Sequence, residues 1–210
     1  MYTHILFDLD GTILDSFEGV SNCVRYSLEK MNRNTDIEYI RFLGPPLKDS
    51  YMKYCFMSEE EALRAVEFYR ERYKPKGLFE GSLYEGVAEI LEKLSKKYTL
   101  ILATSKPYEF AKTLLDHHGI SKYFTDVIGA SFDDKLSEKV DIIRFALEKL
   151  GGEKSGYLMV GDRLCDTEGA VLNGIDAVGV LYGYGDKSEH EKAVFTADSV
   201  KDVALFLGVM

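Results

Sequence analysis

Cysteine is scarce in this sequence, and long apolar runs are absent. Three of the 210 residues are cysteines, and they stand far apart, at Cys23, Cys55 and Cys165. Their odd number and wide spacing argue against a disulfide framework and fit no zinc-ligand pattern. No apolar run approaches the roughly 20 residues that a membrane-spanning helix requires. Because an apolar segment follows Met1 directly, we expect no targeting peptide, reduced thiols and a cytoplasmic location.

Positive charge is also in short supply. The chain has 26 Lys and Arg against 35 Asp and Glu, which gives a formal net charge of −9. Nucleic-acid polymers and anionic membranes attract clustered Lys and Arg, so we expect neither as a partner. A small anionic ligand fits better if positive charge is concentrated locally, for instance by a metal ion. With 46% hydrophobic residues the chain can bury a core, and we expect a monomer or a weak homodimer.

The sequence does contain a regular alternation of two patterns. Short apolar runs indicate strands over Thr3–Phe7, Tyr98–Thr104, Phe124–Ala130, Tyr157–Val160 and Ala177–Tyr182. Amphipathic periods indicate helices over Leu83–Lys97, Tyr108–His118, Ser137–Leu150, Thr167–Asn173 and Ser199–Leu207. This alternation is typical of βαβ units, and strands as uniformly apolar as LILAT fit a sheet covered on both faces. We therefore predict an α/β fold with a doubly wound, Rossmann-like parallel sheet.

One stretch near the N-terminus interrupts the alternation and shows helical periodicity without a convincing strand. It predicts a helix over Phe17–Met31, a second that starts at Gly44-Pro45-Pro46, and a third opened by the capping box of Ser58 and Glu61. A helical insert of this length after the first strand is typical of a separate small domain. We therefore predict an α/β catalytic core, residues 1–15 and 81–210, and an all-helical cap domain, residues 16–80.

Charged and hydroxyl side chains follow the predicted strands at the points where the strands end. In open α/β sheets the ligand site lies beyond these carboxyl ends. The residues gathered there would be Asp8, Asp10, Gly11, Thr104, Ser105, Lys106, Asp162 and Asp166, with Lys139 at a helix start. Four carboxylates repel one another, and a hard divalent cation such as Mg²⁺ is the natural remedy. A lysine and hydroxyls beside that cation would make a pocket for a phosphoryl group.

Four of these segments resemble the motifs of the haloacid dehalogenase superfamily: FDLDGT, ATSK, the lysine at 139 and VGDRLCD. The resemblance covers essentially the whole chain, and the pair FDLDGT and GDxxxD is highly specific. The helical insert, GPPLKDS and the tail GVLYGYG resemble the phosphoglycolate phosphatase-like and 5′-nucleotidase-like branch. The resemblance implies a Mg²⁺-dependent phosphatase that hydrolyses small-molecule phosphomonoesters through an aspartyl-phosphate intermediate.

The resemblance also implies a role for each matching residue. Asp8 would be the nucleophile, and Asp10 would protonate the leaving alcohol and then activate water. Thr104 and Lys139 would hold the phosphoryl oxygens. Asp8, the backbone carbonyl of Asp10 and Asp162 would bind Mg²⁺, with Asp166 close by. Gly11, Ser105 and Lys48 would contact the substrate.

Several assignments keep an alternative. Ser105 and Val140 stand where the family often has Asn and Pro, and Lys135 lies four residues before Lys139. Lys139 is preferred because it opens a periodic helix. Asp166 is also a candidate N-cap for a helix starting at Thr167. Lys48 has two equal readings, a substrate contact or part of an ordinary helix start.

The function keeps alternatives as well. A phosphomutase similar to β-phosphoglucomutase would use the same Asp8 and Asp10, and a phospho-receiver module is the non-enzymatic rival. Asp10 argues against the dehalogenase branch, in which no leaving alcohol needs a proton. The motifs do not specify the leaving group, so phosphoglycolate and nucleoside monophosphates are the substrate classes to test first.

Overall fold

The fold is taken from a computed structural model, which describes residues 1–131 and 136–210. The chain divides into two compact units, one formed by residues 1–14 and 83–210 and the other by residues 15–82. These bounds lie within two residues of the predicted ones, whereas the roles of catalytic core and cap stay predictions. In the described part of the chain, no helix combines the length and apolar character needed to cross a bilayer.

The larger unit contains a six-stranded sheet in the order β5-β4-β1-β6-β7-β8, and its neighbouring strands run parallel. Its strands are β1 (His4–Phe7), β4 (Thr99–Pro107), β5 (Asp126–Ala130), β6 (Tyr157–Gly161), β7 (Asp176–Val180) and β8 (Phe195–Ala197). The first strand of the chain therefore lies in the middle of the sheet, between β4 and β6. This arrangement places the residues that follow β1, β4 and β6 next to one another at one edge.

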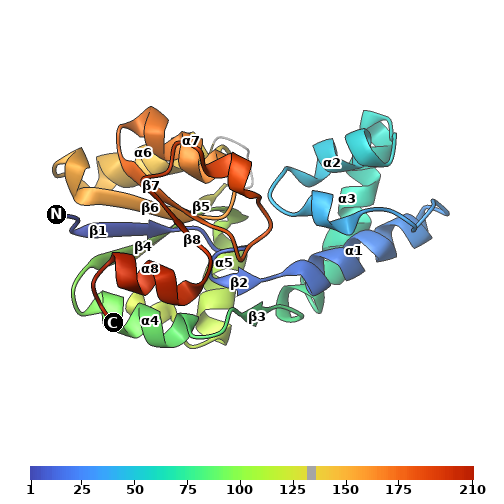
Figure 1. The fold of residues 1–210 in the computed structure, drawn as a ribbon. Coiled ribbons are helices and arrows are strands. Elements are labelled where there is room, and N and C mark those ends of the chain that lie inside the picture. Colours follow the sequence, from blue (N-terminus) through green and yellow to red (C-terminus); the bar gives the residue numbers. More distant parts are fainter. Residues whose placement is uncertain (132–135) are drawn as a thin grey trace. The chain divides into compact units, whose positions relative to one another are not determined.

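Helices cover both faces of this sheet. Figure 1 shows α6 and α7 over one face and α4 and α8 over the other. The helices of this unit are α4 (Val87–Ser95), α5 (Tyr108–His117), α6 (Lys139–Leu150), α7 (Leu164–Asn173) and α8 (Val200–Phe206), with short 3-10 turns η3 (Ser121–Tyr123), η4 (Lys154–Gly156) and η5 (Lys187–His190). Because both faces are covered, the strand interiors are apolar throughout; Leu100, Ile101, Leu102 and Ala103 are all fully buried. The predicted doubly wound α/β fold is confirmed.

The smaller unit is helical. It contains α1 (Phe17–Lys30), α2 (Leu47–Tyr54), α3 (Glu59–Tyr73) and the 3-10 turns η1 (Tyr39–Phe42) and η2 (Gly77–Phe79). The Ser58 hydroxyl accepts a hydrogen bond from the Glu61 amide, and the Glu61 carboxylate accepts one from the Ser58 amide. The predicted capping box is thus present and fixes the start of α3.

The structure moves several predicted boundaries. The helix expected from Leu83 begins at Val87, because Ser82–Leu83 forms β3 and pairs with β2 (Leu14–Asp15). Helix α7 begins at Leu164 rather than Thr167, so the prediction of an Asp166 N-cap is wrong. Strand β8 was not predicted, because three residues carry too little pattern to identify a strand.

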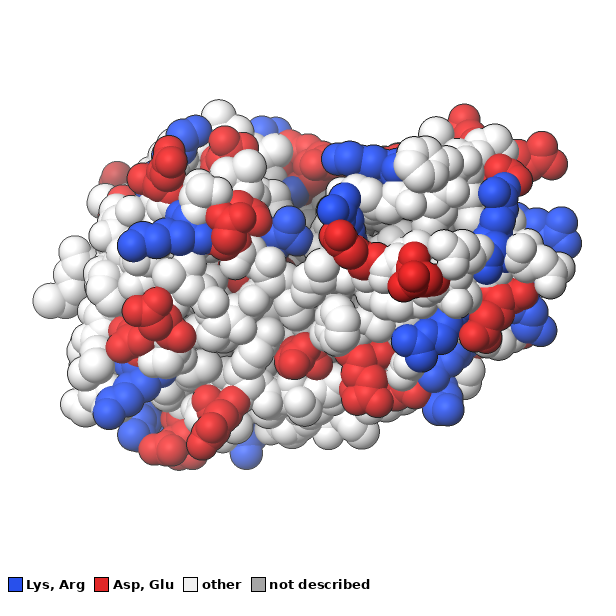
Figure 2. Space-filling view, turned by 45° about the vertical axis from the view of Figure 1, so that its right-hand side comes forward, with Lys and Arg blue, Asp and Glu red and all other residues white. Residues whose placement is uncertain are grey.

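Acidic and basic side chains are mixed on the surface. Figure 2 shows Lys and Arg lying among Asp and Glu on the face in view. Among the described residues, several exposed charges form pairs one helical turn apart. Examples are Lys93 with Glu89 and Lys112 with Asp116, with 2.9 and 3.0 Å between their charged atoms. Exposed pairs of this kind contribute little to stability and neutralise each other locally.

Candidate active site

The turn after β1 carries the first two acids of the site. Asp8 directly follows the strand, is buried, and donates its amide hydrogen to the Val160 carbonyl at 2.9 Å. Three residues later, Gly11 has a φ of +82°, and a Cβ there would lie 2.0 Å from Asp162 Oδ2. Gly11 is therefore required both for the left-handed backbone of the turn and for the close approach of Asp162.

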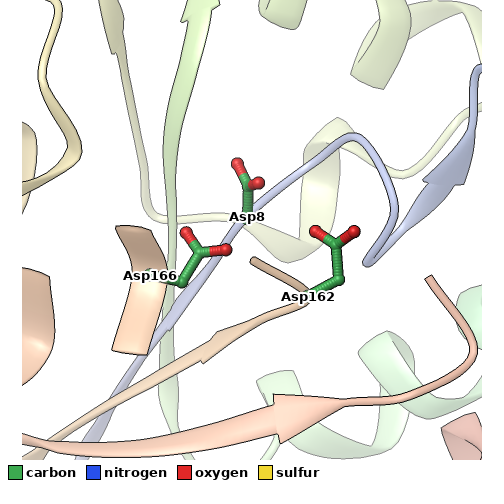
Figure 3. A group of neighbouring side chains, drawn as sticks. All are labelled: Asp8, Asp162 and Asp166. Carbon is green, nitrogen blue, oxygen red and sulfur yellow. The ribbon is translucent and has the colours of Figure 1, made fainter. Parts of the chain in front are cut away.

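A cluster of three buried carboxylates forms where β1, β6 and α7 meet (Figure 3). Asp8, Asp162 and Asp166 each offer an oxygen, and these oxygens lie within 4.8 Å of one another. Asp162 directly follows β6, and Asp166 lies in the first turn of α7, where its carboxylate accepts the Arg163 amide hydrogen at 3.0 Å. The structure thus brings together three of the four predicted metal-binding aspartates through their side chains.

A buried lysine stands against this cluster. Lys139, the first residue of α6, is 3% exposed, and its Nζ lies 2.7 Å from Asp8 Oδ1 and 2.8 Å from Asp166 Oδ1. It also donates to the Ala103 carbonyl at 3.1 Å. Burial alone would lower the pKa of Lys139, but the carboxylates of Asp166 and Asp8 outweigh it and raise this pKa. Lys139 is therefore a fixed cation at the predicted position, whereas Lys135 lies outside the described residues.

One lysine does not balance the buried negative charge. Burial, followed by repulsion from Asp166 and Asp8, raises the pKa of Asp162 well above its ordinary value. Burial likewise raises the pKa of Asp166 to about 6, although Lys139 opposes the shift. Buried, mutually repelling carboxylate oxygens form the donor set that hard divalent cations prefer. The cluster therefore fits a divalent metal ion on the chemistry of its own atoms.

The end of β4 supplies the hydroxyl and a second lysine. Thr104 is buried, and its Oγ1 accepts a hydrogen bond from the Lys106 amide at 3.2 Å. Ser105 lies between them, partly buried. The Lys106 side chain turns to Asp10, with Nζ 2.8 Å from Oδ2. The sequence placed Lys106 at this edge of the sheet but gave it no role, because the ATSK motif alone does not say which acid Lys106 faces.

The loop after β7 positions Asp162 from the opposite side. The Tyr184 amide donates to Asp162 Oδ2 at 2.8 Å, and the Tyr182 hydroxyl donates to the Thr12 carbonyl at 3.0 Å. A Cβ at Gly185 would lie 1.9 Å from the Asp162 carbonyl oxygen. The tail motif GVLYGYG thus supports both the turn after β1 and the Asp162 carboxylate at the end of β6. The sequence alone had assigned this motif no structural role.

Lys48 belongs to the smaller unit. It lies in the first turn of α2, and its Nζ is 3.0 Å from Glu59 Oε1. Pro46 is the N-cap of α2, so the Gly44-Pro45-Pro46 segment does precede a helix as predicted. The predicted contact of Lys48 with a substrate stays a prediction, as do those of Gly11 and Ser105.

Comparison with known proteins identifies the family of this chain. A family model described as haloacid dehalogenase-like hydrolase matches residues 5–180. The chain therefore belongs to the haloacid dehalogenase-like hydrolase family, and the resemblance inferred from its motifs is confirmed.

Individual relatives cover almost the whole chain. A protein of Pseudomonas aeruginosa named 5′-nucleotidase is 36% identical over 203 residues, 94% of this chain and 92% of that one. A protein of Vibrio parahaemolyticus named phosphoglycolate phosphatase is 31% identical over 213 residues, 95% and 93% of the two chains. A crystal structure described as a predicted phosphatase from Clostridium acetobutylicum superposes with a TM-score of 0.92 at 38% identity, covering 100% of both chains.

The close approach of Gly185 to Asp162 gives a first testable prediction. Gly185→Ala forces its Cβ against the Asp162 carbonyl, so the loop or the carboxylate must move. We expect kcat/KM on a chromogenic phosphate ester to fall roughly 10-fold or more, because small misplacements of reacting groups are costly. Lys187→Ala, an exposed change two residues on, should stay within about twofold. Full activity of Gly185→Ala would contradict the positioning role of this loop.

Proposed function

We propose that this protein is a phosphatase that hydrolyses small-molecule phosphomonoesters through an aspartyl-phosphate on Asp8. The observation that carries the proposal is the position of Asp8, whose carboxylate lies 2.7 Å from the buried Lys139 and within the acidic cluster. These contacts hold the Asp8 carboxylate in one orientation, and its burial shields it from bulk water. Both conditions favour a carboxylate that acts as a nucleophile toward phosphorus. The names of the two relatives and the superposed structure support the same reaction.

In the first step the Asp8 carboxylate attacks phosphorus. A bond forms between the carboxylate oxygen and phosphorus, the ester P–O bond breaks, and Asp10 gives a proton to the departing alkoxide, which leaves as the alcohol. Lys139 and Thr104 hold the phosphoryl oxygens while negative charge redistributes among them. Lys139 also reduces the repulsion between Asp8 and an incoming phosphate dianion.

In the second step water attacks the phosphorus of the aspartyl-phosphate. Asp10, now ionised, takes a proton from this water, and the acyl-phosphate bond breaks to release inorganic phosphate and restore the Asp8 carboxylate. The same side chain thus serves as acid and then as base. This sequence needs a carboxylate at position 10, which distinguishes a phosphatase from a dehalogenase.

The metal in this proposal is Mg²⁺. Asp8, Asp162 and the backbone carbonyl of Asp10 would hold it, with Asp166 close by, because all of these offer oxygen ligands. When bound, the cation neutralises negative charge on the phosphoryl group and on the surrounding carboxylates. Orientation of the nucleophile and the movement of protons remain the work of the chain's own residues.

The substrate class is proposed from the relatives. Phosphoglycolate and nucleoside 5′-monophosphates are the two candidates, since proteins named for each share about a third of this sequence. A steady-state panel of both classes, with sugar monophosphates added, tests the choice. Release of phosphate from neither class would overturn this assignment, and dependence on a sugar bisphosphate primer would favour a phosphomutase. Stoichiometric phosphorylation without turnover would favour a phospho-receiver.

The nucleophile assignment gives a second prediction. Asp8→Asn retains the side-chain shape but removes the attacking carboxylate, so we expect phosphate release to fall by at least about 10³-fold. The variant should still fold, as judged by circular dichroism. Asp116→Asn, which changes an exposed aspartate paired with Lys112, is the matched control and should keep wild-type turnover. Substantial activity of Asp8→Asn would exclude Asp8 as the nucleophile.

The buried acids give a third prediction, on pH and metal binding. The folded-state pKa of Asp166, about 6, lies above the unfolded value near 4, so the contribution of Asp166 to the stability of the metal-free protein should fall as pH rises from about 4 to 6. The raised pKa of Asp162 gives a contribution of the same sign. A cation binds the ionised carboxylates, so protons compete with it. The rise in melting temperature caused by Mg²⁺ should therefore be larger at pH 7.5 than at pH 5.5.

Thermal unfolding with and without Mg²⁺ at the two pH values measures this directly. Asp162→Asn should weaken the Mg²⁺-dependent rise at pH 7.5, whereas Asp116→Asn should leave it intact. An equal rise at both pH values, or none, would contradict the proposed metal site.

A further inference from the structure

A second lysine, whose side chain is largely covered, faces Asp10. The side chains of Lys106 and Asp10 are 7% and 23% exposed, and Nζ lies 2.8 Å from Asp10 Oδ2. The second oxygen, Oδ1, is buried and has no hydrogen-bond partner among the residues that the structure describes. One oxygen of Asp10 is therefore anchored by Lys106, while the other is buried with no hydrogen-bond partner among the described residues.

The backbone around Lys106 is fixed, unlike that of a surface lysine. The pairing of β4 with β5 shifts register between Thr104 and Pro107, so Lys106 lies in an irregular end of the strand. Its amide donates to Thr104 Oγ1, and a Cβ at Gly129 would lie 2.8 Å from its carbonyl oxygen. This irregularity turns the strand end away from a regular ladder and aims the side chain at Asp10.

The two lysines of the site thus face different acids. Lys139 contacts Asp8 and Asp166, whereas Lys106 contacts Asp10. On the proposed function, Asp8 forms the bond to phosphorus and Asp10 moves the protons. We propose that Lys106 is a positioning residue for Asp10: by holding Oδ2 it fixes the orientation in which the Asp10 carboxyl group meets the leaving-group oxygen and then the attacking water.

Lys106 acts here through orientation, and its effect therefore depends on how much a substrate needs Asp10. An alkyl phosphate expels an alkoxide, which must be protonated as the bond breaks. p-Nitrophenyl phosphate expels a stable phenolate and needs little help. The parameter kcat/KM covers the steps up to formation of the aspartyl-phosphate and excludes its later hydrolysis. A positioning defect at Asp10 should therefore lower kcat/KM for the alkyl ester selectively.

The experiment compares Lys106→Met with wild type on β-glycerophosphate and p-nitrophenyl phosphate. We expect kcat/KM to fall roughly 10- to 100-fold on the alkyl ester and less than about threefold on the aryl ester. Lys106→Arg, which keeps a cationic donor, should recover part of the loss. Lys112→Met removes an exposed lysine with a similar partner, Asp116 at 3.0 Å, and should change neither value.

A double-mutant cycle isolates the route of the effect. If Lys106 acts through Asp10, Lys106→Met should add less than about twofold on the alkyl ester in an Asp10→Asn background. An equal loss on both esters, or a full additional loss in the Asp10→Asn background, would overturn the proposal. An equal loss on both esters would mean that Lys106 holds the phosphoryl group. A full additional loss in the Asp10→Asn background would mean that Lys106 acts independently of Asp10.

Folding and overall function are checked separately. Circular dichroism confirms that each variant is folded; if Lys106→Met is not, Lys106→Gln replaces it in the same comparison. Wild-type protein that releases no phosphate from either ester would contradict the proposed function. Wild-type protein that is active, with Lys106→Met retaining full activity on β-glycerophosphate, would refute the role of Lys106 alone.

Discussion

Mutual repulsion among Asp8, Asp162 and Asp166 is the constraint on which the rest of this structure depends. Three carboxylates within a few ångströms, all buried, are unfavourable unless cations or fixed donors surround them. Lys139 supplies one cation from the start of α6, between Asp8 and Asp166. The remaining excess of negative charge is what makes the cluster suited to a divalent metal and, with that metal, to a phosphoryl group.

The surrounding backbone brings these acids together and holds them in place. The sheet order places β1 between β4 and β6, so that the acids following β1 and β6 and the hydroxyl ending β4 share one edge. Gly11 has no side chain where Asp162 must lie, and the Tyr184 amide holds the Asp162 carboxylate from the loop after β7. Segments distant in sequence therefore meet around one group of charges. The two aspartates after β1 also differ in environment, since Lys139 contacts one and Lys106 the other.

The sequence predicted the parts of this arrangement that leave a local pattern. Apolar runs located five of the six strands of the main sheet, and their known carboxyl-edge geometry predicted that Asp8, Asp162 and Lys139 would meet. The helix starts were less accurate, because Asp166 fits an N-cap in sequence yet is the third residue of α7, within its first turn. Contacts made by backbone groups could not be predicted, as with Tyr184 and Asp162. Lys106 was placed at this edge but given no partner, because only the irregular end of β4 decides which acid it faces.

The central claim is that Asp8 carries the phosphoryl group during turnover. Rapid acid quenching of the enzyme mixed with an isotopically labelled phosphomonoester traps any phosphoenzyme, and mass spectrometry of the digested protein locates the label. The account predicts phosphate on Asp8, forming before free phosphate accumulates and absent from Asp8→Asn. Free phosphate released with no protein-bound phosphate at any quench time, or label on a residue other than Asp8, would contradict it.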